Sequence, residues 1–239
     1  MIKNTFLLSI YFCLLTNSYS QKNNEQSIAD LFDKKVEEET LAIFNGRHNN
    51  HNYLTLSDTI HPFLDKNFVS GSISYDNQNY DNILIKYDIV NDNVLVKPKK
   101  QSDFYSLVLD SNKIDGFIIN KKKYTNSANQ IDLQTKQLKG FYEEIIYSNK
   151  ITLLIKHQKT KIEIIDGNKI YSDFNNQKLF YLKISDKIYN ANSKKELISI
   201  FPNYKKQINT YYNQNKIQEK FDNYLFKVGL IKFINQLLN

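Results

Sequence analysis

Alternation of apolar and polar residues between Phe68 and Asn190 is the feature that most constrains how this chain folds. Turn dipeptides such as Asn91-Asp92, Ser148-Asn149 and Asp166-Gly167 interrupt the alternation every eight to twelve residues. Period-2 patterning indicates strands with one buried face, and strands joined by short turns pair antiparallel. The sequence therefore predicts an α+β protein that is mostly antiparallel β. We expect a rolled meander sheet or open barrel of about nine to eleven strands over residues 67–190.

Both ends of the mature chain carry helical patterns. Residues 21–66 are expected to hold one amphipathic helix, at about 27–45, and a polar loop over 47–66. Residues 191–239 are expected to form short helices packed on the sheet, so that 27–239 make one globular unit. Ser193 and Glu196 have the spacing of a capping box, and Pro202 should end the helix that they open. The Asp166-Gly167 turn suits type I′.

The first twenty residues resemble an export signal. A short basic start precedes an apolar run from Thr5 to Leu15, which is too short to span a bilayer, and Ser18-Tyr19-Ser20 suits cleavage after Ser20. The mature chain would then begin at Gln21 and be periplasmic or secreted. Cys13, the one cysteine, would leave with the signal. That excludes a disulfide and a cysteine nucleophile from the mature protein, and the sequence does not predict a lipoprotein or a membrane-spanning protein.

The formal charge of +7 comes from lysine. Of 32 basic residues only Arg47 is an arginine, so 32 − 1 = 31 are lysines, spread along the chain. Proteins that read nucleic acids favour arginine, whose planar fork binds phosphate and guanine. We therefore expect no nucleic acid as a partner and interpret the lysines as solvated positions that keep strand edges from aggregating.

Catalytic motifs are sparse. The six glycines are too far apart for a phosphate-binding loop, and no nucleophile motif is present, so no cofactor is expected. His48, His51 and His61 lie within fourteen residues and are weak candidates for a metal site. A solvated role is the favoured interpretation, because the neighbouring residues are mostly Asn rather than carboxylates that would orient the rings.

Several short motifs stand in an order that is similar to a family of secreted proteins. They include Phe44-Asn45-Gly46-Arg47, His61-Pro62-Phe63, Gly71-Ser72-Ile73-Ser74-Tyr75-Asp76, Lys86-Tyr87-Asp88-Ile89 and Gly140-Phe141-Tyr142-Glu143. The chain resembles an uncharacterised β-rich secreted family of Bacteroidota over about residues 40–240. The family has no assigned activity, so the resemblance implies export and a β-rich fold, and it implies no catalytic residue.

Three functions remain open after these exclusions. The first is a non-enzymatic exported protein that binds a protein of the envelope or of an outer-membrane complex. The second is a carrier of a small apolar or glycan ligand inside the rolled sheet. The third is a metal-assisted enzyme that uses the histidine loop. The candidate binding residues are Arg47 and His61 in the polar loop and Tyr75 and Asp76 in the following motif. Arg47 could clamp a carboxylate or phosphate, or cap the end of the preceding helix.

Overall fold

A computed structural model of the chain describes residues 41–50, 53–129, 133, 138–148, 151–185 and 187–238. The chain divides into two compact units, residues 1–45 and 46–239, and each is described by itself. In the first unit Ala42–Phe44 form one 3-10 turn, η2, which ends where the Asn45 N–H donates to the Ala42 carbonyl. Most of the helix expected at 27–45 lies outside the described residues, and its described end is this single turn.

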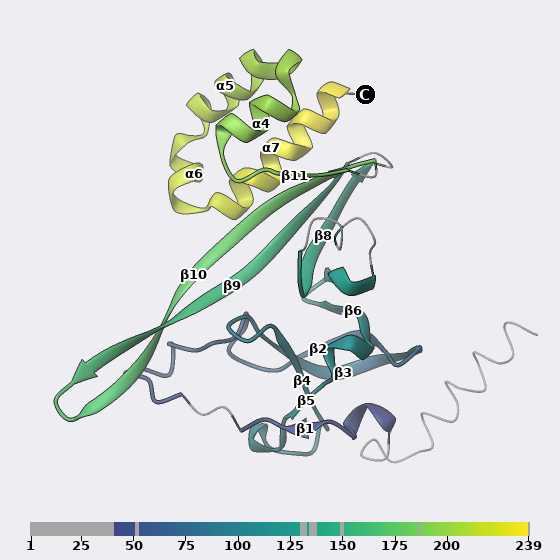
Figure 1. Ribbon diagram of the computed structural model, residues 1–239, viewed down its shortest axis with the longest axis vertical. Helices are drawn as coiled ribbons and strands as arrows, with labels where there is room; N and C mark the ends of the chain where they lie inside the picture. Colours follow the sequence, from purple (N-terminus) through teal and green to yellow (C-terminus); the bar gives the residue numbers. More distant parts are fainter. Residues whose placement is uncertain are drawn as a thin grey trace, which may run out of the picture. The chain divides into compact units, whose positions relative to one another are not determined.

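The second unit is built on one antiparallel sheet (Figure 1). Within the described residues the sheet has eleven strands in the order β1-β5-β4-β3-β2-β6-β7-β8-β9-β10-β11, and it stays open because β1 and β11 are its two edges. The expected mostly antiparallel α+β class is confirmed. The strands are β1 Arg47–His48, β2 Val69–Tyr75, β3 Gln78–Asp88, β4 Asn93–Lys97, β5 Leu107–Val108, β6 Ile114–Ile119, β7 Lys122–Asn126, β8 Phe141–Ser148, β9 Ile151–Asp166, β10 Lys169–Ile184 and β11 Lys187–Asn190.

The strand order departs from a simple meander at one place. β6 pairs with β2 instead of with β5, which precedes it in the chain. One edge of β5 is taken by β4 and the other by β1, so β5 has no edge left for β6. The short 3-10 turn η4, Ser111–Lys113, carries the chain to the open edge of β2, where Asp76 N–H donates to the Lys113 carbonyl.

Tight turns set the register of the hairpins. Asp76 and Asn77 both have positive φ, at 54° and 63°, as the two central residues of a type I′ turn require. The prediction of a type I′ turn with Asp166 and Gly167 as its central residues was wrong. Asp166 pairs with Lys169, so the loop is Gly167 and Asn168, and only Gly167, at 59°, has positive φ. That combination matches type II′, in which glycine takes the first central position.

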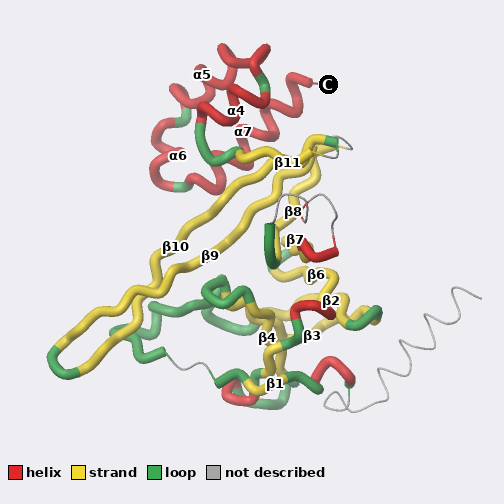
Figure 2. Tube along the Cα trace, viewed as in Figure 1, coloured by secondary structure: helices red, strands yellow, loops and turns green. Residues whose placement is uncertain are grey.

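β9 and β10 form one long hairpin of sixteen residues in each strand (Figure 2). The helices follow β11 and pack on one face of the β9–β10 hairpin, near the end where β9 begins and β10 ends. They are α4 Lys194–Ile200, the 3-10 turn η6 Pro202–Tyr204, α5 Lys205–Gln214, α6 Lys216–Phe221 and α7 Asn223–Leu238. The predicted capping box of Ser193 and Glu196 opens α4. A core joins Leu153, Ile155, Phe180 and Leu182 of the hairpin to apolar residues of α7, among them Phe226, Leu230 and Ile234. Within the described residues, no helix is both long and apolar enough to cross a membrane.

Candidate functional site

The residues predicted to bind a partner lie in different parts of the sheet. Arg47 is exposed on β1, whereas Tyr75 ends β2, four positions away in the strand order, and Asp76 follows it in the turn. Asp76 forms the hairpin turn and an ion pair with Lys113 at 2.9 Å, while Tyr75 is buried. The structure therefore does not bring these residues together into one site, and Asp76 serves a structural contact.

The described histidines of the polar loop, His48 and His61, do not form a metal-binding site. His48 is exposed in β1, and His51 lies outside the described residues. His61 is half-buried and stacks on Phe63, with ring centroids 6.2 Å apart. Burial and the nearby Lys159 ammonium lower the pKa of His61. Among the described residues no group of three or more His, Cys, Asp or Glu side chains is placed to hold a metal ion.

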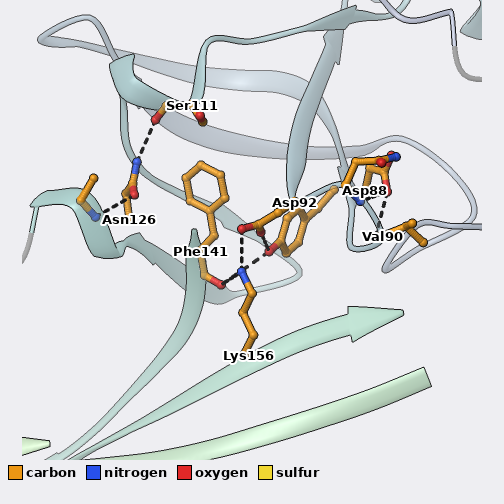
Figure 3. Close-up of polar contacts among 10 residues, drawn as sticks. Asp88, Val90, Asp92, Ser111, Asn126, Phe141 and Lys156 are labelled. Carbon is orange, nitrogen blue, oxygen red and sulfur yellow. Dashed lines mark hydrogen bonds and ion pairs between the residues drawn. The ribbon is translucent and has the colours of Figure 1, made fainter. Parts of the chain in front are cut away.

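An ion pair between a buried lysine and a half-buried aspartate joins β9 to the β3–β4 turn (Figure 3). Lys156 Nζ lies 2.7 Å from Asp92 Oδ2 and also donates to the Phe141 carbonyl, while the Tyr87 hydroxyl donates to Asp92 Oδ1. Burial lowers the pKa of Lys156 against the opposing effect of Asp92. Gly140, at φ +80°, has no side chain to obstruct this pair, because a Cβ there would overlap the Asp92 carboxylate. Each charged group has a partner in the protein, so this pair fixes the fold.

A second buried polar cluster lies between the sheet and α7. Glu143 on β8 accepts hydrogen bonds from His157 Nε2, at 2.6 Å, and from the Tyr224 hydroxyl, and Lys122 Nζ is 3.4 Å from the same carboxylate. Burial raises the pKa of Glu143, but the hydrogen bonds and Lys122 outweigh it and the pKa is lowered. The Tyr124 hydroxyl is also buried, and it has no hydrogen-bond partner among the described residues.

This carboxylate and imidazole resemble catalytic groups in chemistry, but their surroundings do not. The side chains of Glu143 and His157 are only 2% and 3% exposed. A general base must reach a proton on a substrate, directly or through one water molecule. With the carboxylate saturated by His157, Tyr224 and Lys122, the cluster attaches the first turn of α7 to β8 and β9.

The expectation that lysines occupy solvated positions was wrong for four of them. Lys86, Lys97, Lys156 and Lys227 are each at most 9% exposed. The sequence signal that could have found three of them is a lysine inside an apolar strand, since Lys86, Lys97 and Lys156 all follow strongly apolar neighbours. A buried ammonium must be paired or hydrogen-bonded, so each of these lysines is expected to bind a carboxylate or another acceptor inside the fold.

Three exposed isoleucines gather at the end of the β9–β10 hairpin. We call residues 160–171 the hairpin arm, because two backbone contacts bound it: Lys159 N–H donates to the Ile89 carbonyl and Ser172 N–H to the Leu54 carbonyl. Within the arm Ile162, Ile165 and Ile170 are 45%, 77% and 59% exposed.

The arm carries apolar side chains on both of its faces. Ile165 pairs with Ile170 on one face, and Ile164 pairs with Tyr171 on the other. The arm holds seven residues of β9, Thr160–Asp166, which extend about 20 Å, and three residues of β10, Lys169–Tyr171. The four charged residues of the arm, two lysines and two acids, cancel. A two-stranded hairpin is only marginally stable by itself in water, so an arm with apolar residues on both faces gains stability from anything that covers it.

No family model, curated protein or solved structure matches the chain. The resemblance to a secreted family of Bacteroidota therefore stays a prediction.

Proposed function

We propose that the protein is exported and acts without catalysis, by binding another protein of the cell envelope as an accessory subunit of a periplasmic or outer-membrane complex. The observation that supports this most is the hairpin arm, which carries exposed isoleucines and no net charge. Contiguous exposed apolar patches mark sites of interaction with other proteins.

The internal polar clusters support a binding role over a catalytic one. Asp92 pairs with Lys156, and Glu143 hydrogen-bonds to His157, so each of these side chains already has a partner within the protein. An enzyme needs at least one such group facing a substrate cavity. Export rests on the signal pattern of residues 1–20, which lie outside the described residues.

Site-specific crosslinking tests the binding role. A photoreactive residue at position 165 should crosslink to an envelope protein in intact cells, and Ile165→Lys with Ile170→Lys should abolish recovery of that protein. Ile118, an isoleucine of β6 that is 44% exposed, gives the matched control Ile118→Lys. Equal loss in the control, or no crosslink from position 165, would contradict the proposal.

The intact mass of native protein tests export. Cleavage after Ser20 leaves 239 − 20 = 219 residues that begin at Gln21. A full-length mass, or a mass with a lipid attached, would show that the signal interpretation is wrong.

A small-molecule carrier is the second candidate, because a hollow of about 640 Å³ opens beside η4, β7 and the start of β8. Ser111, Asn112, Ser127 and Gly140 contribute to its lining, and the hydroxyls suit a glycan. Asn126, also in the lining, already donates to the Ser111 carbonyl (Figure 3) and to the Ile114 carbonyl. Mass spectrometry of small molecules released from natively purified protein would test this candidate.

A further inference from the structure

Two buried lysines on neighbouring strands share a single carboxylate. Lys86 of β3 and Lys97 of β4 lie on the same face of the sheet, since Lys86 pairs with Leu95 and Lys97 with Leu84. Asp103, in the 3-10 turn η3, Asp103–Tyr105, places Oδ2 3.4 Å from Lys86 Nζ and Oδ1 3.0 Å from Lys97 Nζ. Like charges this close on a sheet face destabilise it unless anions compensate them.

The hydrogen bonds of the two ammonium groups are incomplete. An ammonium has three N–H donors, so the pair has six. Among the described residues their acceptors are the two oxygens of Asp103 and the Gln101 carbonyl, which is 2.7 Å from Lys97 Nζ. The one acceptor that Lys86 Nζ has in the described part of the chain is Asp103 Oδ2, at 3.4 Å, whereas charge-assisted hydrogen bonds are normally about 2.7–2.9 Å.

Aromatic rings, rather than further acceptors, complete the surroundings of Lys86. Its ammonium lies 4.8 Å from the ring centroid of Phe63 and 4.3 Å from that of Phe68. Ring faces attract a cation but offer no oxygen atom, and they lower the local dielectric. Burial accordingly lowers the pKa of Lys86, although Asp103 opposes the effect.

The carboxylate between the lysines is held by an exposed turn. The side chain of Asp103 is 60% exposed, whereas those of Lys86 and Lys97 are 8% and 10% exposed. The residue that follows, Phe104, is 88% exposed. Two buried cations are therefore neutralised by one anion on a surface turn, which leaves one positive charge in excess beneath that turn.

We propose that Lys86 and Lys97 form a binding site for an external oxyanion, a carboxylate or a phosphate group, which exchanges with the carboxylate of Asp103. A phosphate that displaces Asp103 supplies more acceptor oxygens and more negative charge than that carboxylate, and so cancels the excess charge. A free carboxylate replaces Asp103 one for one, without the constraint of the turn that holds Asp103 at 3.4 Å from Lys86 Nζ. Phe63 and Phe68 form the apolar wall of the site. The site is independent of the hairpin arm, so it stands or falls separately from the proposed binding of an envelope protein.

Titration of the purified chain with inorganic phosphate and with acetate tests the site. Each salt is compared with chloride at equal ionic strength, by calorimetry and by thermal unfolding. Asp103→Asn removes the internal competitor and should strengthen anion binding at least tenfold relative to wild type. Lys86→Met should weaken it at least tenfold, while Lys113→Met, which removes an exposed lysine paired with Asp76, should leave it unchanged.

Amide chemical shifts of the wild-type protein give a readout that needs no variant. A saturable shift of the amides of Asp103–Tyr105, with none at Asp76, is expected as the anion displaces the Asp103 carboxylate. A response to phosphate alone identifies a phosphate site, and a response to acetate identifies a carboxylate site. Absence of a shift in both titrations, equal affinity in Asp103→Asn and wild type, or binding retained in Lys86→Met would overturn the proposal.

Discussion

The pH dependence of stability tests whether Lys227 is buried as a charged group without an anionic partner. It lies on α7, is 2% exposed, and donates to the carbonyls of Ala191 and Asn192 and to the Tyr212 hydroxyl at 2.8–3.2 Å. None of these partners is an anion. Burial lowers the pKa of Lys227 from 10.5 to about 8, against smaller opposing effects of Glu219 and Glu196.

The direction of the pH effect follows from where the proton binds. The pKa of Lys227 is lower in the folded state than in the unfolded state, so between about pH 8 and 10.5 the unfolded state holds more protons. The free energy of unfolding therefore rises with pH across this window, and the cost of the buried charge is complete below about pH 8. A pKa of 8 against 10.5 corresponds to a gain of about 2 kcal/mol between pH 7 and 9.5.

Urea unfolding of wild type and Lys227→Met at pH 7 and pH 9.5 measures this gain. The difference between the two proteins should shift by about 2 kcal/mol in favour of wild type as pH rises, because the variant has no group to titrate there. The other buried lysines titrate equally in both proteins and cancel. A difference that stays constant with pH, or that changes in the opposite direction, would refute the assignment of Lys227 as a buried charge without an anion.

Three further changes test other contacts. Gly140→Ala should destabilise the fold by about 3 kcal/mol in chemical denaturation, because the new Cβ meets the Asp92 carboxylate and the residue is held at positive φ. Glu143→Gln should make stability less sensitive to acid. The pKa of Glu143 is lowered in the folded state, so wild type loses stability as pH falls through that pKa. A variant whose stability is as acid-sensitive as that of wild type would contradict the contact between Glu143 and His157. Gly167→Val should cost about 1–3 kcal/mol, since valine is strained at φ +59°, and unchanged stability would exclude the assigned turn.

Local signals predicted the elements whose geometry is decided by nearby residues. The Ser193–Glu196 capping box is satisfied inside four residues of chain, and it opens α4 as expected. The predicted Asn91-Asp92 turn is similarly local, because Asp92 tolerates its positive φ of 58°. Period-2 alternation gave the fold class, since a strand with one buried face needs no information about which strand lies beside it.

The same local reasoning did not predict the length of the β9–β10 hairpin. Ile151–Ile155 and Ile162–Ile165 read as separate apolar runs, but they lie in the one strand β9. The polar residues between them, such as His157 and Lys159, are held by Glu143 and by the carbonyls of His61 and Phe63. Those partners are 14 to 98 residues distant, so no local window contains the reason for continuity.

The sequence by itself determined the strand-forming pattern, the turn chemistry and the helix caps of this protein, because these depend on neighbours within a few residues. Tertiary structure alone decided which acceptors the buried lysines reach. Lys156 and Asp92 are 64 residues apart, and Lys86 and Asp103 are 17 apart across a strand and a turn. A buried charge persists only where distant backbone and side chains converge on it, and that convergence depends on strand order and register, which periodicity leaves open.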